Sequence, residues 1–237
     1  LVKAAEAVDG IFKMQAWAEN PVFALRVAAL DPSLGEDTVR AAQAYYRIMY
    51  GPRDRLVHFE PFLGDTAHPA GAGFYPEDMG KEEFEAWIEA HPGDRDAFMS
   101  LHTIIRRDGE NLLSIPYSQA YRDLLEVAAT ELVEASAATD NESLRRFLEL
   151  RAEAFLSDDY YQSDMDWMDL GDGAIELVIG PYEVYEDTLF GYKAAFESFV
   201  CVAQPEDSAR LEVFKSQLPF LERNLPIPDE HPVINTT

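Results

Sequence analysis

Two short runs rich in β-branched and aromatic residues, Ile175–Ile179 and Phe196–Ala203, interrupt a chain whose other apolar residues recur mainly at helical spacing. Two further runs of this kind flank Asp108-Gly109, a dipeptide typical of tight hairpin turns. We therefore predict an α+β, mainly α-helical fold. It is expected to be a helical bundle with a small antiparallel or mixed β-sheet, made of a hairpin near 101–115 and strands near 174–180 and 196–203.

Apolar residues at helical spacing predict helices along most of the remaining chain. The first helical segment ends at Asn20-Pro21, where a proline favours the start of another. Further helices are expected over 36–50, 118–137, 142–155 and 205–223. We expect the helices over 118–137 and 142–155 to pack as an antiparallel pair.

Helix caps and loops are also suggested by the sequence. Thr139 and Glu142 have the spacing of a capping box, and Asp78 is placed to cap a short helix. Residues 53–76 are irregular and proline-rich, which is typical of a functional loop or of one that lies over a surface. The last helix is expected to face a core with Leu211, Phe214, Leu218 and Leu221.

The charge balance limits the partners that the chain can have. It carries 19 Lys and Arg against 44 Asp and Glu, a net charge of −25. This charge repels nucleic acid phosphates and anionic membranes, so we expect neither as a partner. The same field favours cationic ligands such as the ammonium end of a peptide, although an acidic surface more often serves solubility.

Cysteine usage and hydropathy exclude further classes. Cys201 is the only cysteine, so neither an intrachain disulfide nor a cysteine-based zinc cluster can form. No run approaches the ~20 apolar residues that span a bilayer, and the N-terminal residues lack the apolar region of a signal peptide. We expect a soluble protein and favour the cytoplasm slightly over the periplasm, while the compartment stays undetermined.

Familiar catalytic motifs are absent from the sequence. It has no His-Glu-x-x-His, no P-loop, no dinucleotide-binding glycine fingerprint and no Gly-x-Ser-x-Gly. His58 and Glu60 could supply two metal ligands, but a catalytic zinc needs three, so an exposed pair is the better interpretation. The acids of 157–169 lack the EF-hand register and are interpreted as a solvated acidic turn over aromatic residues. We expect no catalytic residue and no metal ligand in this chain.

One segment carries a more specific pattern. "IELVIGPYEVYEDTLFGYKAAFESFV" contains Glu176, Ile179-Gly180, Glu183, Tyr185, Asp187, Phe190-Gly191 and Phe196–Val200. In these residues it resembles the dipeptidyl peptidase III family of zinc peptidases and its bacterial and plant relatives, some of which are fused to Nudix domains. "PAGAGFYPEDM" and "IIRRDGENLLSIPYSQAY" are similar to other segments of the bacterial relatives.

The resemblance implies an organisation for the chain. In that family the zinc ligands, on a His-Glu-x-x-Gly-His helix and a later glutamate, lie downstream of this segment. Residues 1–237 would then be a single substrate-facing lobe of a larger two-lobed protein, with a helical part over 1–100 and a mixed α/β part over 101–225. Residues 226–237 would connect to a missing C-terminal part, and both ends of the sequence look cut. Zinc is expected in the missing lobe, and no cofactor in this chain.

The resemblance also implies a role for Glu176, because the glutamate that begins this strand helps to hold the N-terminal ammonium of the substrate in that family. Charge-assisted hydrogen bonds of this kind are short and strong. Val178 stands where the characterised peptidases have a tyrosine, which leaves dipeptidyl specificity open. Strand alternation places Glu176, Val178 and Gly180 on one face, and these are the expected substrate-binding residues. A solvated strand glutamate is the alternative for Glu176.

Glu183, Tyr185 and Asp187 alternate in the same way after a bend. We favour an architectural role, in which the carboxylates accept backbone N–H bonds or pair with Lys193 around a turn. A ligand-binding site is the alternative. No role is predicted for the other two acids of the segment, Glu186 and Glu197.

Three functions fit these observations. The chain could be the non-catalytic N-terminal portion of a zinc metallopeptidase that helps to bind a short peptide, with hydrolysis requiring the missing lobe. It could be a stand-alone acidic binding or interaction module without enzymatic activity. It could also be a purely structural acidic domain, in which case it would bind no peptide.

Overall fold

The structure is a computed structural model that describes residues 1–171 and 173–226. The chain separates into two compact units, of which the first comprises Leu1–Gly171 and Leu177–Val200. The second comprises Asp172–Glu176 and Cys201–Thr237. The predicted connector over 226–237 lies almost entirely outside the described residues.

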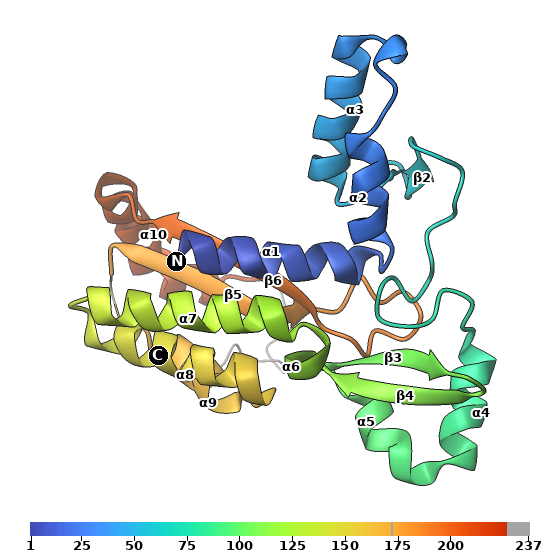
Figure 1. Cartoon of the computed structure of the whole chain (residues 1–237). Helices are drawn as coiled ribbons and strands as arrows, with labels where there is room; N and C mark the ends of the chain where they lie inside the picture. Colours follow the sequence, from blue (N-terminus) through green and yellow to red (C-terminus); the bar gives the residue numbers. More distant parts are fainter. Residues whose placement is uncertain (172, 227–237) are drawn as a thin grey trace. The chain divides into compact units, whose positions relative to one another are not determined.

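The fold is α+β and mainly helical, as predicted (Figure 1). The helices of the first unit are α1 (Val2–Ala16), α2 (Asn20–Ala28), α3 (Glu36–Met49), α4 (Lys81–Ala90), α5 (Arg95–Met99), α6 (Tyr117–Ala120), α7 (Arg122–Ala138), α8 (Glu142–Ser157) and α9 (Tyr161–Met168). The second unit contains α10 (Pro205–Arg223). The paired strands are β1 (Arg53–Asp54) with β2 (Glu60–Pro61), β3 (Thr103–Asp108) with β4 (Asn111–Pro116), and β5 (Ile175–Glu183) with β6 (Ala195–Val202).

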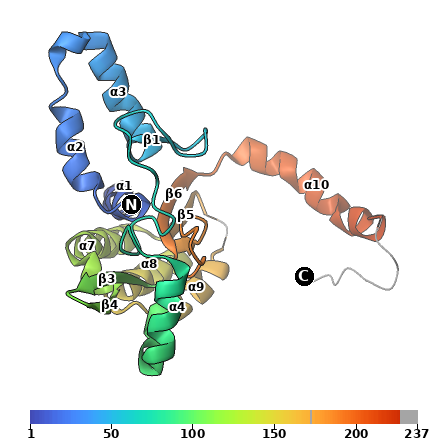
Figure 2. The same cartoon turned by 90° about the vertical axis from the view of Figure 1, so that its right-hand side faces the viewer.

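Four helices pack in succession: α1 on α7, α7 on α8, and α8 on α9. Figure 1 shows α1, α7 and α8 side by side. The apolar residues that sequence periodicity placed on one side of each helix form the core between them, among them Val8, Ile11, Leu125, Leu132, Phe147, Leu148 and Phe155. Figure 2 shows α2 and α3 as a second, antiparallel pair, joined by the short 3-10 turn Pro32–Leu34.

The hairpin β3-β4 forms where the sequence predicted it. The strands are antiparallel, and Asp108 pairs with Asn111 at the turn. Gly109 has a φ of +60°, a left-handed conformation that glycine adopts without steric cost. Leu112 on β4 and Ile104 and Ile105 on β3 are buried in the core.

The irregular segment before the hairpin was expected to be functional or to lie over a surface, but its second half is part of the core. Phe74 and Tyr75 are buried, and the backbone is held from both sides. Gly73 N–H donates to the carbonyl of Gln15 on α1 at 2.7 Å, and Ile105 N–H donates to the carbonyl of Phe74 at 2.7 Å. This segment therefore joins the helical layer to the hairpin.

Two predicted helix caps are wrong. Asp78 does not cap α4, whose N-cap is Gly80; its carboxylate instead forms an ion pair with Arg107 at 3.0 Å. Asn141, not Thr139, caps α8, since its side chain accepts the N–H of Leu144. Three polar residues, Thr139, Asp140 and Asn141, precede α8, and the local pattern does not decide which of them has the required backbone geometry. Before α4 the cap position is a glycine that lies two residues after Asp78.

The acidic stretch over 157–169 is not a solvated turn, because most of it forms α9. The acids of this helix face α8, where Asp164 pairs with Arg151 at 2.5 Å and Asp166 with Arg146 at 3.0 Å. Asp158 ends α8 in a left-handed conformation and accepts the backbone N–H and the hydroxyl of Ser118. The alternating acids thus neutralise arginines of the neighbouring helix.

The last helix has the predicted bounds, and the residues expected to face a core are not buried within the described part of the second unit. Leu211, Phe214, Leu218 and Leu221 are 48–66% exposed. An amphipathic helix is stabilised mainly by burial of its apolar face. No helix in the described ranges is long and apolar enough to cross a membrane.

The glycine at position 73 provides a test of how the irregular segment is held. A Cβ atom at Gly73 would lie 1.9 Å from the backbone carbonyl oxygen of Met14, so α1 and the segment would have to separate. We expect Gly73→Ala to lower the free energy of unfolding by about 2–4 kcal/mol, measured by urea denaturation. Gly93→Ala is the matched control, because a Cβ there meets no atom within 4 Å. Equal stability of the two variants would contradict this role for Gly73.

Candidate functional site

Residues 184–194 connect β5 to β6 and are called the link below. The carboxylate of Asp187 holds the link in its conformation. Its side chain is almost fully buried, with 3% of the residue exposed. Its two oxygens accept five hydrogen bonds of 2.9–3.2 Å, from the backbone N–H groups of Leu189, Phe190, Tyr192 and Lys193 and from the hydroxyl of Tyr75. Because bonds to an ionised acceptor are strong, this carboxylate fixes both the path of the link and its contact with the irregular segment.

Lys193 follows the link but does not pair with the carboxylate through its ammonium group. The side chain is fully buried, and Nζ donates to the carbonyls of Phe98 and Ser100 and to the hydroxyl of Thr103, at 2.6–2.9 Å. Burial lowers the pKa of Lys193 to about 7, while the charge of Asp187 acts in the opposite direction. The contact between Asp187 and Lys193 that was expected around the turn is therefore made by the backbone N–H.

Glu186, for which no role was predicted, is the second buried acid of the link. Only 2% of the residue is exposed, and its carboxylate forms an ion pair with Arg55. The guanidinium of Arg55 also lies near the rings of Phe12 and Phe59, with 5.4 and 5.3 Å to the ring centroids. Removing one member of a buried ion pair leaves an uncompensated charge, so this pair ties the link to the segment after α3.

Tyr185 and Glu197 line a pocket of about 310 Å³ together with Arg55. The size is within the lower range of small-molecule sites. The remaining lining residues come from α1, from the end of α3 and from β6, and are Val8, Asp9, Phe12, Ile48, Tyr50, Phe196, Ser198 and Phe199. Both apolar and polar side chains therefore reach the pocket.

The charged residues that line this pocket are the acids Asp9 and Glu197 and the cation Arg55. Burial raises the pKa of Glu197 above its ordinary value, and the nearby carboxylate of Glu183 raises it further. The pKa of Tyr185 is raised by burial and by Glu183 and Glu197, against the opposing charge of Arg55. Such a pocket can accept hydrogen bonds from a ligand, but its lining residues include no nucleophile paired with a base of the kind used in covalent catalysis.

The substrate-binding residues predicted on β5 are not brought together by a common contact. Glu176 is exposed at the start of the strand, and its side chain makes no ion pair or hydrogen bond with the described residues; Val178 is partly buried. Leu177 and Ile179 point to the core, as alternation predicts, with 1% and 0% exposed. Neither Glu176 nor Val178 lines the pocket around Tyr185.

Gly180 has a steric reason for its place on β5. Its φ is +155°, and a Cβ atom there would lie 2.6 Å from Nη1 of Arg151. Arg151 is fully buried, forms its ion pair with Asp164, and lies 5.4 Å from the ring centroid of Tyr182. Gly180 thus leaves room for a buried arginine beside the strand.

The residues that sequence reasoning missed are the distant partners of the link and of the strand. Arg55 and Tyr75 lie more than a hundred positions before the acids that they contact. Arg151 lies within the helix predicted over 142–155, and nothing in its local sequence distinguishes it from an exposed helix arginine. A buried partner at long range leaves no periodic signal in the sequence.

Metal binding has no support among the described residues. No three His, Cys, Asp or Glu side chains of residues 1–171 and 173–226 lie close enough together to hold a metal ion. Peptidase zinc sites need three protein ligands.

Asp187 provides the test of how the link is built. In Asp187→Asn the acceptor oxygen at Oδ2 is replaced by an NH₂ group that faces the N–H groups of Tyr192 and Lys193. We expect the free energy of unfolding to fall by about 2–4 kcal/mol, measured by chemical denaturation. Asp65→Asn, an exposed substitution in the irregular segment, should change it by less than about 0.5 kcal/mol. An Asp187 variant as stable as this control would show that the carboxylate does not hold the link.

A family model and two solved structures relate the chain to peptidases. The model of peptidase family M49 matches residues 82–233. A solved structure of DPP III from Caldithrix abyssi is 49% identical, with a TM-score of 0.90 over 99% of this chain and 44% of that chain. A structure of dipeptidyl-peptidase III from Corallococcus sp. strain EGB is 39% identical, with a TM-score of 0.83 over 98% and 43%.

A curated plant protein is also similar. Nudix hydrolase 3 of Arabidopsis thaliana is 34% identical over 277 residues, which cover 96% of this chain and 36% of the plant protein. The chain thus spans less than half the length of each of these relatives. The family model, which covers more than half of the chain, and the two solved structures agree, and the chain belongs to peptidase family M49, with a dipeptidyl peptidase III-like fold.

Proposed function

We propose that this chain is the non-catalytic, substrate-facing N-terminal portion of a dipeptidyl peptidase III-like zinc metallopeptidase. In this proposal it helps to bind the N-terminal end of a short peptide, and hydrolysis requires zinc held by a C-terminal lobe. Membership of family M49 is the observation that carries the proposal.

The state of Glu176 supports a binding role. In the described part of the chain, the buried acids Asp166, Glu186 and Asp187 each have a cationic or N–H partner, whereas Glu176 is exposed and has none. Its carboxylate is therefore available to a peptide ammonium without first breaking an internal bond. A charge-assisted bond at this position would be strong and directional.

The second unit supports the proposal that another lobe is a partner. The apolar residues of α10 are exposed within the described residues, and large exposed apolar patches mark interaction surfaces. A C-terminal catalytic lobe is a partner that would cover them.

Peptide binding can be tested by calorimetry with tetra-alanine and its N-acetylated form. We expect Glu176→Gln to weaken the binding of the free peptide by about tenfold or more, because the charge of the acceptor is lost. Acetylation of the peptide should have a similar effect on the unmodified protein. Glu110→Gln, at the exposed turn of the hairpin, removes the same charge and should bind normally. Equal affinities for the two variants, or for the two peptides, would contradict the assignment of Glu176.

A second experiment tests whether hydrolysis requires the C-terminal lobe. We expect the 237-residue chain to leave tetra-alanine intact with or without added Zn²⁺, as followed by mass spectrometry. Full-length protein should release dipeptides, and a chelator should stop the release. Turnover by the chain alone would refute a non-catalytic role. Peptide binding by a full-length protein that hydrolyses nothing would favour a binding module instead.

A further inference from the structure

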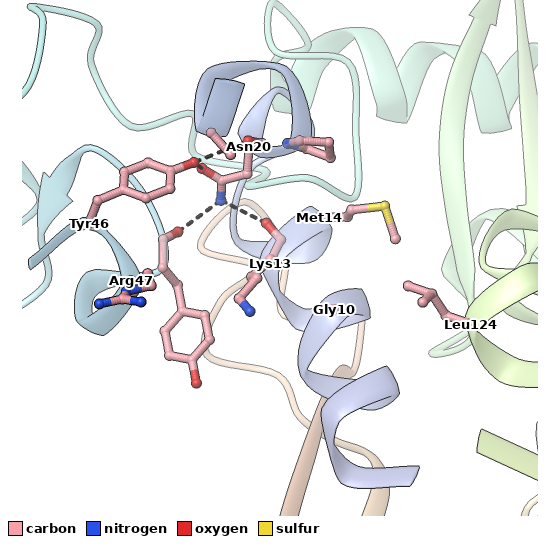
Figure 3. Close-up of a pocket in the computed structure, with 10 residues that line it drawn as sticks. Gly10, Lys13, Met14, Asn20, Tyr46, Arg47 and Leu124 are labelled. Carbon is pink, nitrogen blue, oxygen red and sulfur yellow. Dashed lines mark hydrogen bonds between the residues drawn. The ribbon is translucent and has the colours of Figure 1, made fainter. Parts of the chain in front are cut away.

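A second pocket, lined by none of the expected substrate-binding residues of β5, lies where α1, α2, α3 and α7 meet (Figure 3). Its volume is about 290 Å³, near the lower limit for small-molecule sites. Most of its lining is apolar or aromatic and comes from Gly10, Met14, Pro21, Ala24, Tyr46, Tyr50 and Leu124. The other lining residues are Lys13, Asn20 and Arg47.

The polar groups of Asn20 are already used inside the protein. Its Nδ2 donates to the backbone carbonyls of Lys13 and Tyr50, at 2.7 and 2.8 Å, and its Oδ1 accepts the hydroxyl of Tyr46 at 3.1 Å. Figure 3 shows these bonds on one side of the pocket. A ligand that placed a polar group there would find no free partner, and burying an unpaired polar group is unfavourable. The interior of the pocket therefore favours the hydrocarbon part of a ligand over a polar group.

The same bonds make the walls rigid. Asn20 connects the end of α1, the start of α2 and the end of α3, so the three helices that surround the pocket are held at one point. On the opposite wall Gly10 brings α1 close to α7, because a Cβ there would lie only 3.2 Å from Leu124 Cδ1. A preformed apolar cavity binds with a smaller loss of conformational entropy than one that must be ordered.

The charge at this pocket is opposite to that of the protein. The chain has 44 acidic and 19 basic residues, yet the lining of the pocket includes two basic residues and no acidic one. Lys13 forms an ion pair with Asp9 at 2.6 Å. Arg47 is exposed and has no carboxylate within ion-pair distance among the described residues, so its guanidinium is available. Guanidinium groups bind carboxylates through two parallel hydrogen bonds.

We propose that this pocket binds a small apolar monocarboxylate, with its hydrocarbon body between the helices and its carboxylate at Arg47. The volume suits a body of one aromatic ring and a short chain. Since no β5 residue contributes to the lining, the proposal is independent of peptide binding at Glu176. An acidic peptide or a second copy of the chain would be competing occupants.

The experiment is calorimetry of the 237-residue chain with 4-phenylbutyrate and with its neutral counterpart 4-phenylbutanol. We expect one site for phenylbutyrate and binding of the alcohol that is about tenfold weaker or more, because the charged contact is lost. Arg47→Gln should reduce phenylbutyrate binding to the level of the alcohol. Ala24→Phe should abolish the binding of both ligands by filling the pocket.

Arg40→Gln is the matched control, because Arg40 lies on the same helix and is exposed, but it pairs with Asp37 and does not line the pocket. It should bind phenylbutyrate within about twofold of the unmodified protein. Circular dichroism of each variant checks that it is folded. Equal binding of acid and alcohol, or equal loss in the Arg40 and Arg47 variants, would overturn the proposal. So would the absence of binding at millimolar ligand.

Discussion

The carboxylate of Asp187 is the interaction on which the arrangement around β5 and β6 depends. It gathers four backbone N–H groups of the link and the hydroxyl of Tyr75, which belongs to a segment more than a hundred residues earlier. One buried anion thus defines a local turn and a long-range contact together. The N–H groups would otherwise be buried donors without acceptors, which is costly in a protein interior.

Buried charges elsewhere in the first unit follow the same logic. Arg53 donates to the carbonyls of Thr66 and Ala67, Arg151 pairs with Asp164, and Lys193 uses three oxygen acceptors. Each cation is surrounded by groups from a different part of the chain. The first unit is therefore stabilised by a helical core and by charged side chains that fasten irregular segments to it.

The sequence predicted the parts of this structure that have a local cause. Helix periodicity located α3 and α10 within about one residue of their observed bounds. Asp108-Gly109 located the hairpin, because a glycine with positive φ is required there. The alternation also located the buried side chains of Leu177 and Ile179 on β5, but not the burial of Gly180, which it placed on the same face as Glu176.

Contacts between residues far apart in the sequence could not be predicted from local patterns. The pairing of Glu186 with Arg55 requires the fold to bring two remote segments together, and neither local sequence indicates burial. The acids of α9 looked like a solvated turn because their partners, Arg146 and Arg151, lie on another helix. The same limit applies to the candidate site. The sequence pattern grouped Glu183, Tyr185 and Asp187, but it did not indicate that Asp187 accepts backbone N–H groups while Tyr185 lines a pocket.

Glu176 differs from the buried acids Asp187 and Glu186 in the contacts of its carboxylate. A carboxylate that accepts several N–H bonds, such as Asp187, cannot bind a ligand without losing part of the fold. A carboxylate in an internal ion pair, such as Glu186, must first leave its partner. Glu176 is under neither constraint within the described residues, so a ligand ammonium would add an interaction and replace none. In a protein with a charge of −25 exposed acids are common, so exposure alone does not assign a ligand to Glu176, and the binding role proposed for it rests on the family to which the chain belongs.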